Sequence, residues 1–245
     1  MYDEVGHERV LPTDDHSVQR DLRPLDDSSS TVGSSECSRE VRLANDSYLN
    51  GWLRRILDVT VALALLLLMA PLLALIAMAI RTTSPGPILF RQRRHGRGMK
   101  EFELLKFRSM HWAGEQEKNV VQAVRGDSRI TPVGGILRQT SLDELPQLIN
   151  VLKGEMSLVG PRPHAVEHDV RYMAEIPHYR ERFNARPGLT GLAQINGARG
   201  CTPTVEDMAQ RIDLDVVYLQ RASLALDCWI FIATVKEVLF SKSAY

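Results

Sequence analysis

The feature that most constrains this chain is a run of 22 residues without a charge, from Val59 to Ile80. At about 1.5 Å per helical residue the run spans about 33 Å, and the hydrocarbon core of a bilayer is about 30 Å thick. We therefore expect residues 48–85 to form a helix that is embedded in a membrane.

Two features argue against a simple crossing of the bilayer. Pro71 lies in the middle of the run, where it leaves a backbone carbonyl unpaired and costs about 3 kcal/mol if nothing compensates. Arginines also lie on both sides, and a straight span would place one group outside, against the preference of positive charge for the cytoplasmic side. They are Arg54 and Arg55 before the run and Arg81, Arg91, Arg93, Arg94 and Arg97 after it. We predict a re-entrant helix broken at Pro71; a kinked helix that crosses the bilayer is the alternative.

Charge is distributed unevenly along the chain. Residues 1–50 hold 11 acidic and 5 basic residues, which leaves 25 basic and 19 acidic residues for the rest. A basic domain suits an anionic lipid surface or a phosphate-bearing substrate. Nothing resembles a module that reads RNA or DNA, so we predict no nucleic-acid partner. Residues 1–47 are polar without a sustained apolar period, and we expect a disordered tail there.

The remaining residues, 86–245, predict a catalytic domain of the α+β class that is mostly helical. Two strands, at 88–92 and 101–107, flank a basic segment with glycines and are typical of a small β-hairpin. Further helices are expected at 114–124, 164–179, 206–221 and 224–240, the last lying in the membrane interface or on the domain. Loops are expected at 127–135 and 186–197, with a helical turn at 136–139. The three cysteines form no CxxC pair, which argues against a zinc site and a disulfide framework.

The residues that can carry chemistry are concentrated in 140–163, where Asp143 and Glu144 stand together before an amphipathic helical run and a Gly-Pro-Arg-Pro turn. Pro146 is best tolerated in the first turn of a helix, which makes Asp143 the expected N-cap; a capping box from Ser141 to Glu144 is the other register. A carboxylate can also attack phosphorus when cations neutralise the electrophile. Mg²⁺ is the expected ion, because the available ligands are oxygens.

Cationic and polar side chains outside this stretch are further candidates for binding a substrate. Lys106 and Arg108 follow the second strand beside an aromatic residue, where they are either surface charges or anion contacts. Arg138 precedes Asp143 by five residues. In the glycine-rich segment 186–197, Arg186 supplies charge and Gln194 lies near the end, which favours a pocket wall over a plain surface turn.

Two histidines and one membrane-edge carboxylate have simpler interpretations. His164 and His168 have the spacing of a two-histidine metal site, but the glutamate of an HExxH pattern is missing, so structural or hydrogen-bonding roles are favoured. Asp58 is expected to pair with Arg54 or Arg55 at helical spacing.

Three motifs then make the pattern specific: KFRSM at 106–110, SLDELPQLINVLKGEMSLVGPRP at 141–163 and RPGLTGLAQING at 186–197. In this order after an apolar run with a central proline, they resemble the bacterial sugar transferase family, over about residues 50–240. These monotopic phosphoglycosyl transferases begin exopolysaccharide and glycan assembly at the bacterial inner membrane, with the catalytic domain on the cytoplasmic face. The resemblance implies transfer of a sugar 1-phosphate from a UDP-sugar to undecaprenyl phosphate, giving a lipid-linked diphosphate sugar and UMP.

The resemblance also implies roles for single residues. Asp143 matches the family's nucleophile, and Glu144 matches its partner, which is tied to Mg²⁺ and activation. Arg138 matches an arginine that holds phosphate, and Arg162 lies in the matching GPRP turn. Pro71 matches the proline that breaks the re-entrant helix. The family often has serine before that proline, whereas this chain has Ala70, so no hydroxyl can satisfy the freed backbone there.

The identity of the sugar and the alternatives to this activity stay open at the level of sequence. PHAVEHD at 163–169 and NGARGCTPTVEDM at 196–208 resemble the branch that transfers glucose 1-phosphate, more than branches using galactose or N-acetylated sugars. A non-catalytic membrane adaptor and a metal-dependent phosphohydrolase are the competing classes. A homo-oligomer is compatible with the sequence.

Overall fold

The computed structural model of the chain describes residues 47–112, 114, 126–198, 200, 202 and 204–240. Apart from Ser47 and Gly114, the expected polar tail and the helix expected at 114–124 lie outside these residues. The described fold is mostly helical and contains two small sheets, one antiparallel (β1–β2) and one parallel (β3–β4). The expected α+β class is confirmed at this level.

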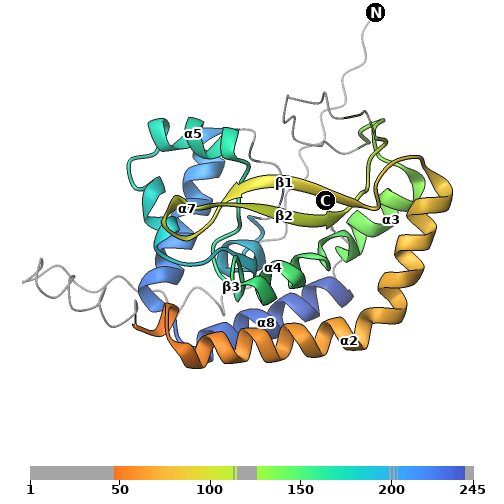
Figure 1. Ribbon diagram of the computed structural model, residues 1–245. Coiled ribbons are helices and arrows are strands. Elements are labelled where there is room, and N and C mark those ends of the chain that lie inside the picture. Colours follow the sequence, from red (N-terminus) through yellow and green to blue (C-terminus); the bar gives the residue numbers. More distant parts are fainter. Residues whose placement is uncertain are drawn as a thin grey trace, which may run out of the picture. The chain divides into compact units, whose positions relative to one another are not determined.

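The apolar run forms the middle and most of the second half of one long helix, α2 (Trp52–Thr83). Among the described residues, the helical stretch Ser47–Thr83 is long and apolar enough to cross a membrane, and only 11% of its apolar window is buried. The helix continues through Pro71, so the structure does not divide it into two elements. Figure 1 shows that its second half turns toward the β1–β2 hairpin, and proline is a common cause of such a bend.

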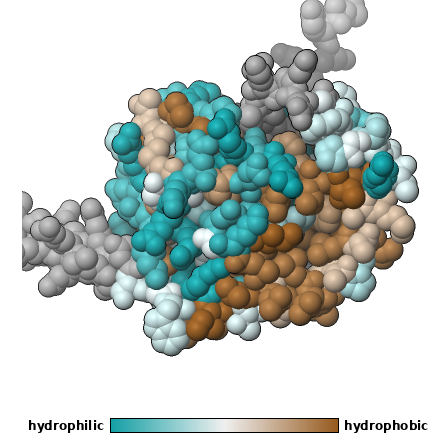
Figure 2. All heavy atoms as spheres, viewed as in Figure 1, coloured by the Kyte–Doolittle hydropathy of each residue, from teal (hydrophilic) through white to brown (hydrophobic). Residues whose placement is uncertain are grey.

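Exposed apolar side chains gather along α2 and the last helix, α8 (Leu224–Phe240). Leu67 and Leu68 are each 68% exposed on α2, and Ile232 is 67% exposed on α8. Figure 2 shows this hydrophobic surface along the lower side of the molecule, where Figure 1 places the two helices. A contiguous apolar surface of this kind marks a membrane or protein contact, which makes α2 a candidate membrane anchor.

Buried polar contacts fasten the amino-terminal part of α2 to the rest of the domain. Arg54 forms an ion pair with Asp227 of α8 (3.0 Å) and donates to the Val159 carbonyl (2.6 Å) and the Tyr218 hydroxyl (2.8 Å). Asp58 accepts hydrogen bonds from Ser157 Oγ (2.7 Å) and the Leu158 amide (3.0 Å). The expected pairing of Asp58 with a neighbouring arginine is therefore wrong, because the strand β3 (Ser157–Val159) offers two better-placed donors.

The predicted hairpin is confirmed as strands β1 (Leu89–His95) and β2 (Glu101–Phe107), joined through the 3₁₀ turn η2 (Arg97–Met99). It packs on α4 (Gln147–Lys153), whose Leu148 and Val151 share a core with Phe102 and Leu104 of β2. Asn150 fixes the alignment, since its side chain accepts from the Leu105 amide (3.0 Å) and donates to the Glu103 carbonyl (2.7 Å).

Two expected loops contain regular structure. The helix α3 (Pro132–Gln139) begins earlier than expected, because the Thr131 side chain caps it by accepting from the Gly134 amide (2.9 Å). The segment 186–197 contains strand β4 (Gly188–Thr190), which pairs in parallel with β3, and the short helix α6 (Leu192–Ile195). A Cβ atom at Gly188 would lie 2.1 Å from the Gly160 amide nitrogen, and one at Gly160 would lie 2.6 Å from the Arg186 carbonyl oxygen, so both positions need glycine where these segments meet.

The remaining elements form a second core beside the hairpin. They are α5 (Val166–Glu175), the 3₁₀ turn η4 (Tyr179–Asn184) and α7 (Val205–Arg221). Tyr172, Tyr179, Met208 and Ile212 are buried together between them. The helices expected at 164–179, 206–221 and 224–240 are thus confirmed, the first with shorter bounds. The side chain of Cys228 is exposed and unpaired.

Replacement of Arg54 by methionine is expected to lower the free energy of unfolding by about 3–5 kcal/mol, because it leaves Asp227 without its cation in a buried site. Arg91→Met is the matched control, since Arg91 pairs with Glu103 on the surface and its side chain is 64% exposed. The control is expected to change stability by less than about 1 kcal/mol. Denaturant unfolding in detergent micelles measures both; equal effects of the two substitutions would contradict the anchoring role of Arg54.

Candidate active site

The paired carboxylates lie on a 3₁₀ turn, η3 (Leu142–Glu144), and not at the cap of a helix. No side-chain cap hydrogen bond forms there, and α4 begins only at Gln147, after Pro146. The expected N-cap role of Asp143 is therefore wrong. Ser141 enters the turn with a φ of 58°, in the left-handed region that costs a non-glycine residue about 1–3 kcal/mol. Such strain is frequent where a backbone presents functional side chains.

Glu144 is held between two cations from distant parts of the chain. Arg162 donates from both terminal nitrogens, at 2.5 Å to Oε1 and 3.2 Å to Oε2, and Lys106 Nζ lies 2.9 Å from Oε1. The side chain of Glu144 is 11% exposed, so these charge-assisted contacts act in a partly dehydrated environment. The carboxylate of Glu144 on η3 is thus contacted both by the hairpin, through Lys106, and by the GPRP turn, through Arg162.

Asp143 differs from its neighbour in having an available carboxylate. Within the described residues no hydrogen bond ends on its side chain, although the residue is only 9% exposed. Burial, followed by the charge of Glu144, raises the pKa of Asp143 to about 6, while Lys106, Arg138 and Arg162 oppose this rise. The predicted candidates Lys106, Arg138 and Arg162 are therefore brought together around Asp143 and Glu144.

Three other predicted binding residues are engaged elsewhere. Arg108 donates to the Ser84 carbonyl and hydroxyl (both 2.8 Å) and to the Pro85 carbonyl, and so holds the carboxyl end of α2. Arg186 donates to the Gly154 carbonyl (3.1 Å) beyond the end of α4. Gln194 donates to the Leu189 carbonyl (3.0 Å). These bonds give all three side chains a structural role, and the geometry does not place them with Asp143 and Glu144.

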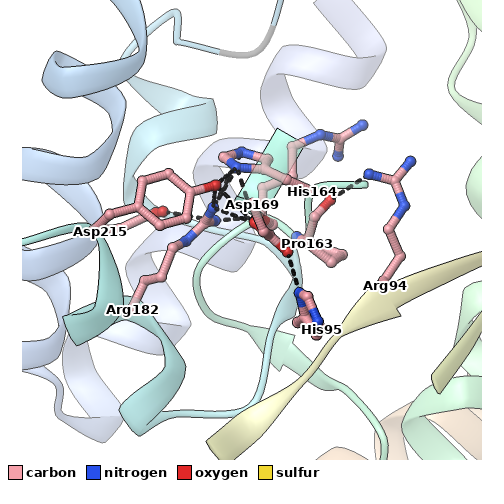
Figure 3. A network of polar contacts seen from close by, with 9 residues as sticks. Arg94, His95, Pro163, His164, Asp169, Arg182 and Asp215 are labelled. Atoms are coloured by element: carbon pink, nitrogen blue, oxygen red, sulfur yellow. Dashed lines mark hydrogen bonds and ion pairs between the residues drawn. The ribbon is translucent and has the colours of Figure 1, made fainter. Parts of the chain in front are cut away.

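A second polar network, behind the GPRP turn, was not predicted from the sequence. Asp169 accepts from the Tyr179 hydroxyl (2.7 Å) and lies 2.9 Å from His95, and Arg182 lies 3.0 Å from Asp215 (Figure 3). Arg182 also donates to the backbone carbonyl of Arg162. The network therefore holds the backbone of the residue whose side chain binds Glu144.

The contacts of the two histidines agree with the predicted structural or hydrogen-bonding roles. His164 Nδ1 lies 2.7 Å from the Tyr179 hydroxyl and is also contacted by Arg182. His168 stacks edge-on against Tyr172, with 6.4 Å between ring centroids. The sequence signal that could have revealed the network is the set of isolated charges in otherwise apolar helical patterns, such as Asp169 and Asp215.

Carboxylate oxygens are the type of ligand that Mg²⁺ prefers, and Asp143 and Glu144 are the paired carboxylates of this site. Asp143 and Glu144 supply adjacent carboxylate oxygens, and the described residues contain no group of three or more His, Cys, Asp or Glu side chains suited to a metal. Mg²⁺ commonly binds one or two carboxylates and completes its shell with water and phosphate oxygens. Two protein carboxylates beside a phosphate-bearing substrate would meet this coordination preference.

The sequence of the chain is similar to those of known proteins. The family model described as "Bacterial sugar transferase" matches residues 49–241. A protein of Caulobacter vibrioides named UDP-glucose:undecaprenyl-phosphate glucose-1-phosphate transferase is 56% identical over 192 residues, covering 78% of this chain and 72% of the relative. An Escherichia coli protein of the same name is 48% identical, covering 81% of this chain and 43% of the relative.

One relative carries a different sugar in its name. A protein of Aeromonas hydrophila, named UDP-N-acetylgalactosamine-undecaprenyl-phosphate N-acetylgalactosaminephosphotransferase, is 39% identical over 188 residues, which is 77% of this chain and 44% of the relative. The chain thus spans most of the Caulobacter protein but less than half of the two longer relatives. A match over nearly all of the described residues, together with these identities, shows that the chain belongs to the bacterial sugar transferase family.

Proposed function

We propose that this chain transfers glucose 1-phosphate from UDP-glucose to undecaprenyl phosphate and releases UMP, a step that starts exopolysaccharide or glycan assembly. The observation that carries the proposal is the buried carboxylate of Asp143, to which no described residue donates a hydrogen bond, beside a Glu144 that Lys106 and Arg162 hold in place. Two of the relatives named above carry this reaction in their names, and their identity to this chain exceeds that of the N-acetylgalactosamine relative. This difference favours glucose as the sugar.

The geometry supports a two-step reaction. An Asp143 oxygen attacks the phosphorus that bears the sugar, forms a bond to it and breaks its bond to the bridging oxygen, so that the electron pair leaves with UMP. A phosphate oxygen of undecaprenyl phosphate then attacks the same phosphorus and releases Asp143. Lys106, Arg138 and Arg162, which act on the Asp143 carboxylate, also lie where they can offset the charge of the phosphates.

Mg²⁺ is part of this proposal. When bound, it would be held by Asp143 and Glu144 and would supply positive charge to the phosphate oxygens. Glu144 is already committed to Lys106 and Arg162, so Asp143 offers the less occupied carboxylate. Through the ion, Asp143 and Glu144 would position the phosphates of the UDP-sugar close to the attacking oxygen of Asp143.

We further propose that α2 enters and leaves the membrane from the cytoplasmic side of the inner membrane, with α8 lying in the interface. Both ends of α2 are bonded to the same domain: Arg55 donates to the Val151 and Leu152 carbonyls of α4, and Arg108 of the domain holds Ser84 at the other end. Ile76 and Ile80 also share a core with Phe107 and Leu137. A helix that crossed the bilayer would have to separate its ends by about 30 Å of hydrocarbon, whereas here one domain contacts both.

Asp143→Asn is expected to reduce UMP release by at least about 1,000-fold, because the amide cannot act as the nucleophile. The assay supplies UDP-glucose, undecaprenyl phosphate and MgCl₂ to the full chain in vesicles, and Asp213→Asn, an exposed acid on α7, is the matched control. Persistent turnover in Asp143→Asn would contradict the nucleophile assignment. Release of free phosphate or sugar phosphate without the lipid would indicate a phosphohydrolase, and a panel of UDP-sugars tests the preference for glucose.

The same substitution is expected to stabilise the ligand-free protein at alkaline pH. The pKa of Asp143 is about 6 in the fold, above its usual 3.8, so the folded protein binds the proton more tightly than the unfolded chain does. The cost of ionisation is therefore complete above pH about 6, shrinks as the pH falls from 6 to about 4, and disappears below the unfolded pKa. Asp143→Asn should be more stable than the parent by on the order of 3 kcal/mol at pH 8 and equal to it near pH 3. Denaturant unfolding at the two pH values measures this; a pH-independent difference would contradict it.

The topology of α2 can be tested with single cysteines at Trp52 and Thr83, in a chain whose three cysteines have been replaced by serine. Trp52 is 75% exposed and Thr83 is exposed at the other end of the helix, so neither replacement disturbs the core. A membrane-impermeant thiol reagent should label both positions from the same side of sealed vesicles. Labelling from opposite sides would require a helix that crosses the bilayer.

A further inference from the structure

Four arginines surround His164, and they come from four separate elements. They are Arg94 on β1, Arg162 in the GPRP turn, Arg182 on η4 and Arg211 on α7. Burial and then these four charges hold the pKa of His164 well below its usual value. Figure 3 shows Arg182 on one side of the turn at Pro163 and His164, and Arg94 on the other. The region therefore concentrates guanidinium groups around His164, and one of them, Arg162, binds Glu144 beside the proposed nucleophile.

Two of the four arginines are matched by carboxylates. Arg162 binds Glu144, and Arg182 lies 3.0 Å from Asp215 and 3.9 Å from Asp169. Their burial is thus compensated in the usual way, by ion pairs and hydrogen bonds.

The other two have no such partner. In the described part of the chain, neither Arg94 nor Arg211 forms an ion pair, and their hydrogen bonds go to neutral oxygens. Arg94 donates to the Pro163 carbonyl (3.3 Å) and to Gln92 Oε1 (2.5 Å), and Arg211 donates to the Gly200 carbonyl (2.6 Å). The Nε atom of each is buried without a hydrogen-bond partner.

A buried guanidinium without an anion is unfavourable, and the surroundings of these two show why. Burial, followed by the charge of Arg162, lowers the pKa of both Arg94 and Arg211 to about 10, although carboxylates beyond ion-pair distance, such as Asp169 for Arg94 and Asp215 for Arg211, oppose the shift. Arg211 is only 5% exposed, so water cannot replace the missing counter-charge fully. In the described part of the chain, both residues thus carry a charge that no ion pair neutralises and an Nε–H donor without a partner.

We propose that Arg94 and Arg211 form, together with Arg162, a phosphate-binding subsite for the nucleotide-side phosphate of the UDP-sugar. The inference rests on the proposed function. Arg94 donates to the carbonyl of Pro163, the residue next to Arg162, and both Arg94 and Arg211 act on Arg162, whereas Lys106, Arg138 and Arg162 are the cations that act on Asp143. That placement suits the leaving phosphate, which receives the electron pair when the bond between the two phosphorus groups breaks. Guanidinium groups with free N–H donors suit such an oxyanion.

The test measures UDP binding directly by titration calorimetry, using the full chain in lipid nanodiscs with MgCl₂, and it needs no turnover. The variants are Arg94→Met and Arg211→Met, with Arg94→Lys and Arg211→Lys to restore charge. Arg93→Met is the control on β1, since Arg93 pairs with Glu101 on the surface and its side chain is 71% exposed. Arg221→Met is the control at the exposed end of α7.

Each methionine variant is expected to weaken UDP binding by at least about tenfold, because it removes a charge-assisted contact. The lysine variants should recover part of the affinity, and the surface controls should stay within about twofold. The KM for undecaprenyl phosphate should remain at the parent value. The Tm of the unliganded methionine variants should not fall, since an uncompensated buried charge has been removed.

Unchanged UDP affinity in both methionine variants would overturn the subsite. A raised KM for undecaprenyl phosphate with unchanged UDP affinity would assign the arginines to the lipid phosphate instead, and would also overturn the proposal. A lower Tm in the absence of UDP would indicate a structural role. If the parent protein binds UDP but releases no UMP, the proposed function fails while the subsite is still tested.

Discussion

The clamp of Lys106 and Arg162 on Glu144 is the interaction on which the arrangement of the site depends. A carboxylate with an 11% exposed side chain would be strongly destabilised without cations, and the two that it finds come from segments 38 residues before and 18 residues after it. Each cation is positioned by its own support. Asn150 sets the alignment of β2, and Arg182 holds the carbonyl of Arg162. Several elements of the fold thus hold the side chain of Glu144, whereas the neighbouring carboxylate of Asp143 stays available to a substrate.

The helix α4 connects this site to the candidate membrane anchor. Its amino end begins directly after the turn that carries Asp143 and Glu144, and its last carbonyls accept from Arg55 of α2. Arg186 adds a further donor just beyond that end, at Gly154. Cations at the carboxyl end of a helix are favourable for both hydrogen bonding and the helix dipole. A short, rigid element therefore fixes the separation between the apolar helix and the proposed nucleophile, which suits a reaction with a lipid-borne acceptor.

Local patterns in the sequence predicted the elements well but predicted the roles of individual residues unevenly. The hairpin, the long apolar helix and the helix ending at Phe240 follow from periodicity and turn residues. The cap at Asp143 was wrong, because a left-handed Ser141 starts a separate 3₁₀ turn, and such backbone reversals leave little trace in composition. The motif KFRSM contains both Lys106, which lies beside Asp143 and Glu144, and Arg108, which holds the carboxyl end of α2. The motif alone did not distinguish these two roles. The arginines around His164 could not be grouped at all, since they come together only through tertiary packing.

The same packing explains how the protein tolerates a site that is costly to fold. Asp143 carries a raised pKa, Ser141 a strained backbone, and Arg94 and Arg211 buried Nε atoms without partners. Close by, Arg54, Asp169 and Arg182 are almost fully buried, and each engages several partners at once. A buried polar network is stabilising only when each of its groups has hydrogen-bond or ion-pair partners. Charged groups with such partners and charged groups without them therefore have different roles. The satisfied ones fix the backbone of the turns, and the unsatisfied ones remain where a phosphate-bearing substrate would complete them.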